Sequence, residues 1–320
     1  MRARLPAMAL WCVAATPAVA LDFAPFAVVN QNPFVQIYGL PPPLPIAADR
    51  AHHRQEAALS FDIASHYVAQ AAPGESLFID GESYRTTLSA RGDNGPWNWA
   101  LQLPYIAHTG GVLDESIIDW HNTLGFDQGG RDLAATGQLQ YLYIRNGITV
   151  FELAQPRAGI GDALAQMQYA LTRDWAAQFS LKLPTGDSAS LLGSGSTDVS
   201  AASAWQWRRG DFGAYARAGV LALTRGDVLT AQQRRAVPFG NALLAWGFSP
   251  TLTLKLQADA HGRFYNGSEL DSLGSESLQI GIGGSLAATK SSKIELAVIE
   301  DALVATAPDV TFHLRWRVAY

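Results

Sequence analysis

The last residues of the chain alternate between apolar and polar side chains with a period of two. In "DVTFHLRWRVAY", one face carries Val310, Phe312, Leu314, Trp316, Val318 and Tyr320, and the other carries Thr311, His313, Arg315, Arg317 and Ala319. Successive side chains of a β-strand point to opposite sides of the sheet, so this segment predicts a strand with one apolar face. Lipid-facing strands of membrane β-barrels have this pattern, and a half-buried strand of a soluble sheet is the alternative.

The same alternation recurs along the chain, in segments long enough to cross about 25 Å of hydrocarbon at a tilt. These segments are 57–67, 97–105, 161–171, 175–183, 199–207, 212–223, 252–261, 278–287 and 294–302. Short polar turns alternate with longer stretches near 108–137, 186–197, 225–237 and 265–275. Outer-membrane barrels keep short turns on the periplasmic side and long loops outside, and a terminal aromatic strand is typical of them.

The tryptophans favour the membrane barrel over a soluble sheet. All of those in the expected strands lie near a short turn or the end of the chain: Trp97, Trp99, Trp175, Trp205, Trp207, Trp246 and Trp316. Indole rings favour the interface between lipid and water, so this distribution predicts an aromatic girdle on the periplasmic side.

Composition is consistent with that class and excludes others. Hydrophobic residues make up 48% of the chain and charged residues only 16%, against about 25% charged in soluble domains. Beyond the first twenty residues no run of 18 or more apolar residues could form a transmembrane helix. The formal charge is −5, and nucleic-acid binding is not expected because it requires a basic surface.

Residues 1–20, "MRARLPAMALWCVAATPAVA", are expected to be a secretory signal peptide. Two arginines precede a short apolar run, and Ala18-Val19-Ala20 is a small-x-small cleavage signal. Its removal would change the formal charge from −5 to −7 and would take away Cys12, the single cysteine. Thiol-based catalysis, disulfides and metal-thiolate sites are therefore not expected.

The number of strands depends on the segment "QLQYLYIRNGITVFEL" (138–153). If it forms a hairpin in an external loop, the barrel has about 12 strands, and if its Asn146-Gly147 turn is periplasmic it has about 14. Its mixed pattern and short arms favour about 12. The expected fold is thus an all-β transmembrane antiparallel barrel over 57–320.

Residues 21–56 precede the first expected strand. The segment "NQNPFVQIYGLPPPLPI" (30–46) contains prolines that cannot donate hydrogen bonds within a sheet. It is either a periplasmic lead-in or a plug that enters the lumen. The candidate plug residues are Asn30, Gln31, Asn32, Phe34 and Tyr38.

One amphipathic helix is expected within "VLDESIIDWHNTLGFDQGGRD" (112–132), in the longest external loop. Its apolar stripe is Leu113, Ile117, Trp120 and Leu124, and His121 and Arg131 are further candidate residues of this loop. A helix with an apolar stripe must pack against something. It is predicted to lie over the barrel mouth as a lid, with a buttress beside the mouth as the alternative.

The sequence gives only weak evidence for a metal site or for catalysis. The loop offers His108, Asp119 and other metal-ligating side chains, but no known metal-binding spacing, so hydrogen bonding within the loop is favoured and no metal or other cofactor is expected. A lipid hydrolase would need a serine beside His66 or His261. Neither segment carries a serine motif of known outer-membrane hydrolases, so no catalytic residues are assigned.

The inward-facing polar residues are better candidates for function. They are Asp62, His66, Lys182, Lys255, Asp259, His261, Glu295, His313, Arg315 and Arg317. Mixed charges on facing strands can either line a water-filled path or pair and fill a narrow lumen.

Several segments together resemble an uncharacterised family of proteobacterial outer-membrane proteins, domain of unknown function 3187, from about Asn30 to Tyr320. The most specific are "NQNP", the Gly-Gly to Gly-Gly-Arg loop (110–131) and "LKLPTGD" (181–187). "GIGDALAQMQY" (159–169) and "LKLPTGD" are also similar to barrels associated with aromatic degradation. The resemblance implies the bacterial outer membrane and no established activity.

The predicted function is a passive channel or transporter for small solutes, and not an enzyme. A non-conducting structural or adhesion barrel is the alternative, and a lipid hydrolase comes third. The expected partners are outer-membrane lipid, a small solute, and the barrel assembly machinery acting on the C-terminal strand. The sequence does not determine an oligomeric state.

Overall fold

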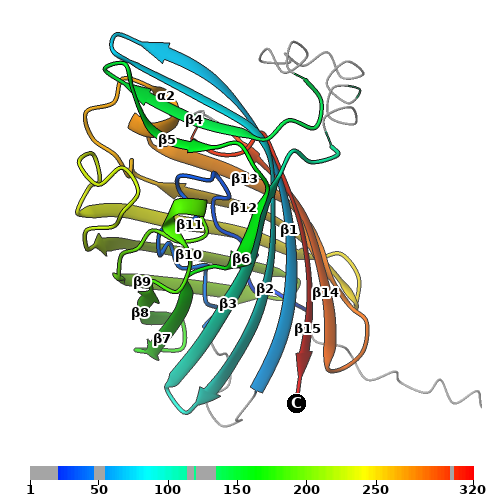
Figure 1. Cartoon of the computed structure of the whole chain (residues 1–320). Helices are drawn as coiled ribbons and strands as arrows, with labels where there is room; N and C mark the ends of the chain where they lie inside the picture. Colours follow the sequence, from blue (N-terminus) through cyan, green and yellow to red (C-terminus); the bar gives the residue numbers. More distant parts are fainter. Residues whose placement is uncertain (1–20, 47–54, 114–118, 120–134, 303–305) are drawn as a thin grey trace, which may run out of the picture.

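Twelve antiparallel strands close into a barrel in the computed structural model, which describes residues 21–46, 55–113, 119, 135–302 and 306–320 (Figure 1). Closure comes from the pairing of β1 (Gln55–Ala72) with β15 (Val310–Ala319), over Glu56↔Ala319 to Ser65↔Val310. The strands between them are β2 (Glu75–Asn94), β3 (Trp97–Thr109), β7 (Ala163–Ala170), β8 (Trp175–Leu183), β9 (Asp198–Arg209), β10 (Phe212–Leu223), β11 (Ala236–Gly247), β12 (Leu252–His261), β13 (Ser277–Ala287) and β14 (Ser292–Asp301).

Three further strands extend the sheet beyond the closed barrel. β4 (Gln140–Arg145) pairs with the outer part of β2 and with β5 (Ile148–Leu153), and β6 (Arg157–Ile160) pairs with the outer part of β3. Asn146 and Gly147 both have positive φ, as a two-residue hairpin turn requires. The segment 138–153 is therefore a hairpin outside the barrel closure, and the prediction of about 12 strands is confirmed.

The two ends of the barrel differ. At the end named here the turn end, short connections join β2 to β3, β7 to β8, β9 to β10, β11 to β12 and β13 to β14. The opposite loop end carries the β4–β5 hairpin and the longer connections (Figure 1). One connection at the loop end was not expected, because β1 and β2 continue past the barrel and meet in a tight turn at Pro73-Gly74.

Helical structure is minor. The described residues contain the single-turn helix α2 (Asp271–Gly274) and the 3₁₀ turn η2 (Ser188–Ser190), and no helix among them could span a bilayer. The helix predicted within 112–132 lies almost wholly outside the described residues, and with it Ile117, Trp120, His121, Leu124 and Arg131. Of its stripe only Leu113 is described, and its backbone N–H donates to the Glu82 carboxylate.

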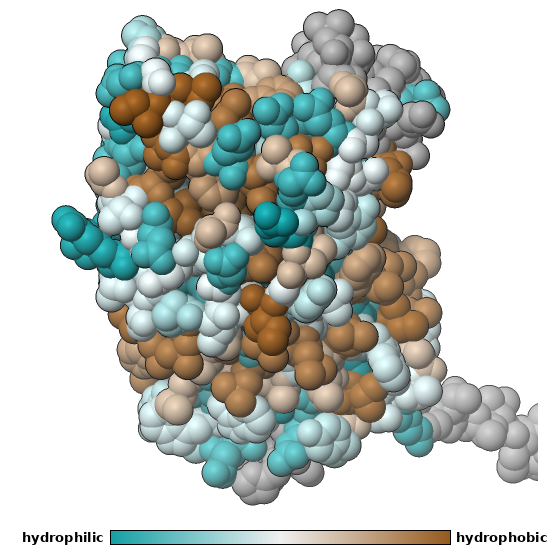
Figure 2. Space-filling view, viewed as in Figure 1, coloured by the Kyte–Doolittle hydropathy of each residue, from teal (hydrophilic) through white to brown (hydrophobic). Residues whose placement is uncertain are grey.

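The two faces of the wall have opposite character. On β15, Phe312, Leu314 and Trp316 point outward and are exposed, while His313 and Arg317 point inward and are buried. The apolar outer surface forms a band over the turn-end half of the barrel, below a more polar loop end (Figure 2). The tryptophans of the strands lie near the turn end, and all of them except the half-buried Trp205 are exposed. The alternation read from the sequence thus assigns the two faces correctly.

The N-terminal segment 21–46, called the plug segment here, lies inside the barrel (Figure 1). Residue Asp22 contacts the turn-end part of β12, β14 and β15, Asn30 reaches His261 near the loop end, and Ile46 returns to Ala176 and Ala245 near the turn end. The segment therefore runs up one side of the lumen, turns, and descends along the other side.

An apolar cluster holds the turn of the plug segment at the loop end. Phe34, Ile37 and Tyr38 pack with side chains of the β4 hairpin, such as Tyr141, and of the loops, such as Phe264. The Tyr38 and Phe264 rings are stacked with their centroids 4.7 Å apart. The main apolar core of the protein therefore closes the loop end, while the lumen below it is polar.

We expect a charged side chain in the outer apolar band to destabilise the barrel. Ile282→Arg, in the middle of β13, should lower the free energy of unfolding from phospholipid vesicles by about 2–4 kcal/mol, because an arginine at the bilayer midplane is poorly solvated. Ile148→Arg, on the β4–β5 hairpin, is the matched control, since Ile282 and Ile148 are 64% and 68% exposed. Urea titration measures both changes, and equal losses would contradict the placement of the band in lipid.

Candidate functional site

A network of buried charges fixes the start of the plug segment to the wall. The Asp22 carboxylate bonds to the Arg317 guanidinium and lies 3.2 Å from the Lys255 ammonium. Lys255 also contacts Glu295 at 2.6 Å, so it joins Asp22 to the wall carboxylate. Burial raises the pKa of Asp22, but the charges of Arg317, Lys255 and Lys293 outweigh it and hold that pKa well below its usual value. Asp22 is therefore ionised and electrostatically bound.

The network continues up the wall through His313. Its Nε2 lies 3.4 Å from Glu295 and its Nδ1 lies 2.5 Å from Asp62 on β1. The strand register places Asp62 directly opposite His313 across the β1–β15 pairing. The His313–Asp62 contact thus links the two strands whose pairing closes the barrel.

A second charged cluster binds the descending arm of the plug segment. Lys182 on β8 contacts Asp162 at 2.6 Å and Asp198 at 3.0 Å, and donates to the carbonyl of Ile37 at 3.0 Å. Asp198 in turn accepts a hydrogen bond from the Gly39 backbone N–H at 2.9 Å. A Cβ on Gly39 would lie 2.9 Å from the Cβ of Lys182, so this close approach requires glycine.

The proline stretch is held by its carbonyl groups. Prolines donate no backbone hydrogen bond and leave their carbonyls free for other donors. Arg217 on β10 donates to the carbonyls of Pro41 at 2.7 Å and Pro42 at 3.1 Å. Gln166 on β7 and Gln178 on β8 donate to the carbonyls of Pro42 at 3.0 Å and Leu44 at 2.8 Å. The inner wall therefore binds this arm mainly through polar side chains.

The Asn-Gln-Asn-Pro segment forms the turn of the plug segment. The Asn30 side-chain oxygen accepts from the Asn32 N–H at 2.8 Å, and the Asn32 side chain accepts from the Phe34 N–H at 2.9 Å. Such side-chain bonds to the backbone two residues on stabilise turns. The Asn30 amide also reaches His261 Nε2 at 2.9 Å. The motif therefore reverses the chain and anchors it to the wall.

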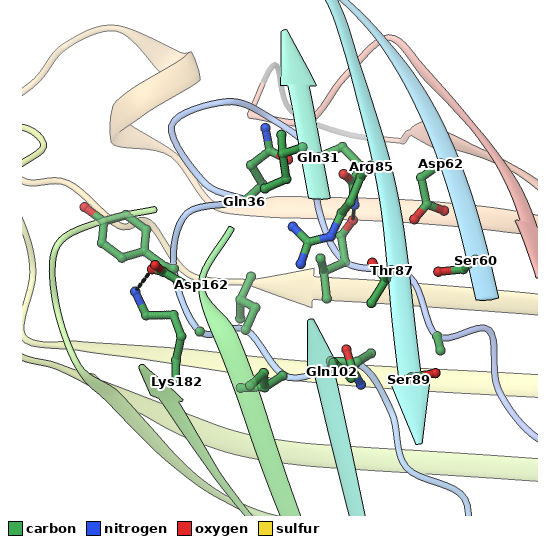
Figure 3. Close-up of a pocket in the computed structure, with 18 of the residues that line it drawn as sticks. Gln31, Gln36, Ser60, Asp62, Arg85, Thr87, Ser89, Gln102, Asp162 and Lys182 are labelled. Atoms are coloured by element: carbon green, nitrogen blue, oxygen red, sulfur yellow. Dashed lines mark hydrogen bonds and ion pairs between the residues drawn. The ribbon is translucent and has the colours of Figure 1, made fainter. Parts of the chain in front are cut away.

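Between the two arms of the plug segment and the wall lies a cavity of about 40 Å³, which is lined by side chains of β1, β2, β3, β7, β8 and β15 (Figure 3). Gln31 and Gln36 lie close to Arg85 at one end, with Thr87, Ser89 and Gln102 along the wall, and the Asp162–Lys182 pair on the other side. Arg315 and Asp62 also line it. The cavity holds a few water-sized groups and is much smaller than a drug-sized pocket.

The structure places all ten predicted lumen residues on the inner face of the wall, all of them buried except Asp259, which is half-buried. It brings Asp62, Lys255, Glu295, His313 and Arg317 into one network. Four of the other predicted residues lie apart from it: Lys182 has its own cluster, Asp259 bonds Asn241 and Gln257, His66 bonds Ser83, and His261 bonds Asn30. The tenth, Arg315, lines the cavity.

The two histidines considered for catalysis lie in packed surroundings. His66 Nε2 lies 2.8 Å from the Ser83 hydroxyl, which is also 3.0 Å from His108 Nδ1, and Ser83 is only 1% exposed. His261 bonds Asn30 and the Gly262 carbonyl.

Sequence reasoning missed several lumen residues: Asp22, Arg85, Asp162, Asp198 and Arg217. Arg85 could have been found, because "SYRTTLSAR" (83–91) alternates and puts Ser83, Arg85, Thr87 and Ser89 on one face. Asp22 has no such signal, since its partners Lys255 and Arg317 are 233 and 295 positions away.

Comparison with known proteins now identifies the family. The model of the family described as "Protein of unknown function (DUF3187)" matches residues 4–320. The chain belongs to this family. The resemblance noted in the sequence is therefore confirmed, while no curated protein matches the chain.

Solved structures support the fold of this DUF3187 protein. An outer membrane channel from Pseudomonas putida F1 is 13% identical, with a TM-score of 0.55, and the match covers 87% of this chain and 97% of the channel. The NanC porin (9% identity, TM-score 0.44, 83% and 98% covered) and the toluene transporter TodX from Pseudomonas putida (11%, 0.35, 84% and 89%) are more distant. At these identities the likeness concerns the barrel fold alone.

The charge network predicts a large effect of one substitution in the DUF3187 chain. Asp22→Asn should lower the free energy of unfolding by about 3–5 kcal/mol, because it leaves buried cations without their counter-charge. Lys293→Gln is the control, since Lys293 lies 3.7 Å from Asp22 and is partly exposed, so its loss should cost about 1 kcal/mol or less. Urea unfolding of both variants in vesicles tests this, and equal costs would contradict the proposed anchor.

Proposed function

We propose that this protein is a passive channel for small solutes in the bacterial outer membrane, closed in this conformation by the plug segment. One observation carries the proposal: the lumen is filled by residues 21–46, which precede the barrel, and not by wall side chains alone. Eight-stranded barrels are narrow enough for their own side chains to fill, and the interior widens with strand number. A twelve-stranded wall encloses space that a movable segment can open.

The way the plug segment is bound supports movement of its arms. Most of the wall contacts of the descending arm are hydrogen bonds from Lys182, Arg217 and glutamines to backbone carbonyls. A typical hydrogen bond contributes only about 0.5–1.5 kcal/mol, because water replaces the lost partner. If the descending arm left the wall, water would therefore replace its hydrogen bonds to these polar side chains. The apolar cluster around Phe34 and Tyr38 is the strongest restraint on the turn.

The outer surface and the fold support the membrane location. The exposed apolar band and the tryptophans at the turn end match the outside of outer-membrane barrels, which supports a periplasmic position for the turn end. The fold similarity to the Pseudomonas putida F1 channel agrees with this location. The C-terminal strand β15 is then the segment on which the barrel assembly machinery acts, and lipid surrounds the band.

A non-conducting structural barrel is the second candidate, and the packing of the lumen favours it. Three cavities within the described part of the barrel measure about 20–40 Å³, and the apolar cluster closes the loop end. A lipid hydrolase has less support, because the Ser83 hydroxyl between His66 and His108 is buried. A conductance measurement distinguishes the channel from the non-conducting structural barrel.

A disulfide between the plug segment and the wall tests the channel. A Cβ on Gly213 would lie 3.0 Å from the Phe23 Cβ, which a small backbone shift brings to the 3.5–4.5 Å that disulfides span. The sequence offers no competing cysteine in 21–320. In planar bilayers, oxidised Phe23→Cys/Gly213→Cys protein should conduct several-fold less than after reduction, because the tether holds the ascending arm in the lumen.

Each single-cysteine variant, treated with the same oxidant, is the matched control and should conduct like the unchanged protein. A variant without residues 21–46 should conduct more than the unchanged protein and more than the single-cysteine variants. If neither the full chain, the reduced double variant nor the shortened chain carries current, the channel is rejected and the filled structural barrel is favoured.

A further inference from the structure

Most buried or half-buried cations of the lumen have a bonded partner, but the half-buried Arg85 and the buried Arg315 do not. Lys182, Lys255, Arg317 and His313 contact carboxylates, and Arg217 donates to plug carbonyls. Within the described part of the chain, Arg85 and Arg315 form no hydrogen bond or ion pair, and Arg85 Nη1 is buried without a partner. Both guanidinium groups line the 40 Å³ cavity beside the plug segment.

The strand register explains how they share this cavity. Arg85 lies opposite Asp62 on β1, and Arg315 lies opposite Ser60, two residues along the same strand. Ser60 also lies opposite Thr87 of β2. Adjacent strands are about 4.8 Å apart, so two long side chains separated by one strand can converge over the hydroxyl groups of Ser60 and Thr87.

The carboxylates beside the two arginines are already bound. Asp62 contacts His313 at 2.5 Å, and Asp162 contacts Lys182 at 2.6 Å and accepts from the Gly186 and Ser194 N–H groups. Asp62 and Asp162 also attract Arg85, but neither forms an ion pair with it. Three cations, Arg85, Arg315 and Lys182, and two carboxylates line the cavity, so positive charge exceeds negative charge by one. An unpaired buried charge is costly, and natural proteins keep such groups mainly where they act on something.

The plug segment adds unpaired polar groups to the same cavity. Gln36 is 5% exposed, and neither its amide nitrogen nor its amide oxygen has a partner among the described residues. The Gln31 side-chain oxygen is also unpaired, although its nitrogen donates to the Val29 carbonyl at 2.9 Å. Figure 3 shows both amides close to Arg85. The site thus has cationic donors from the wall and a neutral donor from the plug segment.

We propose that this cavity binds the carboxylate group of a small organic anion, with Arg85 and Arg315 as its cationic ligands and Gln36, Ser60 and Thr87 as neutral donors. A guanidinium group presents parallel N–H donors that match the two oxygens of a carboxylate. The inference rests on the proposed function, because it names the class of solute that the channel would pass. It makes the solute class anionic and places the plug segment in direct contact with it.

Acetate is a probe of suitable size, and acetamide is its uncharged counterpart. Saturation-transfer NMR titrations on the full chain in detergent micelles should show acetate binding and no acetamide binding. The double variant Arg85→Gln/Arg315→Gln should bind acetate about tenfold more weakly or worse, because two charge-assisted hydrogen bonds are lost. Its melting temperature should be unchanged or higher, since removing unpaired buried charges relieves their desolvation.

Arg209→Gln, which removes an exposed arginine near the turn end, is the matched control and should bind acetate like the unchanged protein. Equal affinity for acetate and acetamide, or unchanged acetate affinity in the double variant, would overturn the site. Acetate binding without conductance in any variant would reject the channel and leave the site standing. Conductance without arginine-dependent acetate binding would reject the site alone.

Discussion

The pairing of β1 with β15 is the interaction on which the rest of the structure depends. A sheet in contact with lipid cannot leave an open edge, because unpaired N–H and C=O groups in hydrocarbon each cost several kcal/mol. The antiparallel pairing of β1 with β15, with Asp62 opposite His313 and Ser60 opposite Arg315, provides hydrogen-bond partners for the backbone groups of both strands. It also brings β2, β1 and β15 together, so that charges from both ends of the chain meet on one inner wall.

Closure of twelve strands creates an interior that the wall does not fill, and the plug segment occupies it. Residues 21–46 fill this space and form no strand of the sheet. The prolines leave carbonyl groups for Arg217, Gln166 and Gln178, and the two asparagines build the turn at the loop end. An apolar cluster then fixes that turn, so the segment is held firmly at one end and by polar contacts along its descending arm.

The distribution of charge inside the barrel connects this architecture to the proposed function. Where the plug segment or the wall supplies a carboxylate, as around Lys255 and Lys182, the cation is structural. At Arg85 and Arg315 the nearby carboxylates are bound to other cations, and the positive charge faces a cavity beside the plug segment. Replacing a bonded cation should therefore affect stability, whereas replacing an unpaired one should affect what the lumen binds.

The sequence by itself determined the strands, their two faces and the hairpin outside the barrel. Alternation and the Asn146-Gly147 turn are local properties, since side-chain direction along a strand depends only on position within it. The inward set, including Lys255 and His313, followed from the same rule. Which of these charges are paired depends on the tertiary structure. Asp22 meets Arg317 across 295 positions, and Arg85 forms no ion pair with Asp62, which lies opposite it, because partner choice depends on closure, register and the path of the plug segment. None of these is encoded in a short window of residues.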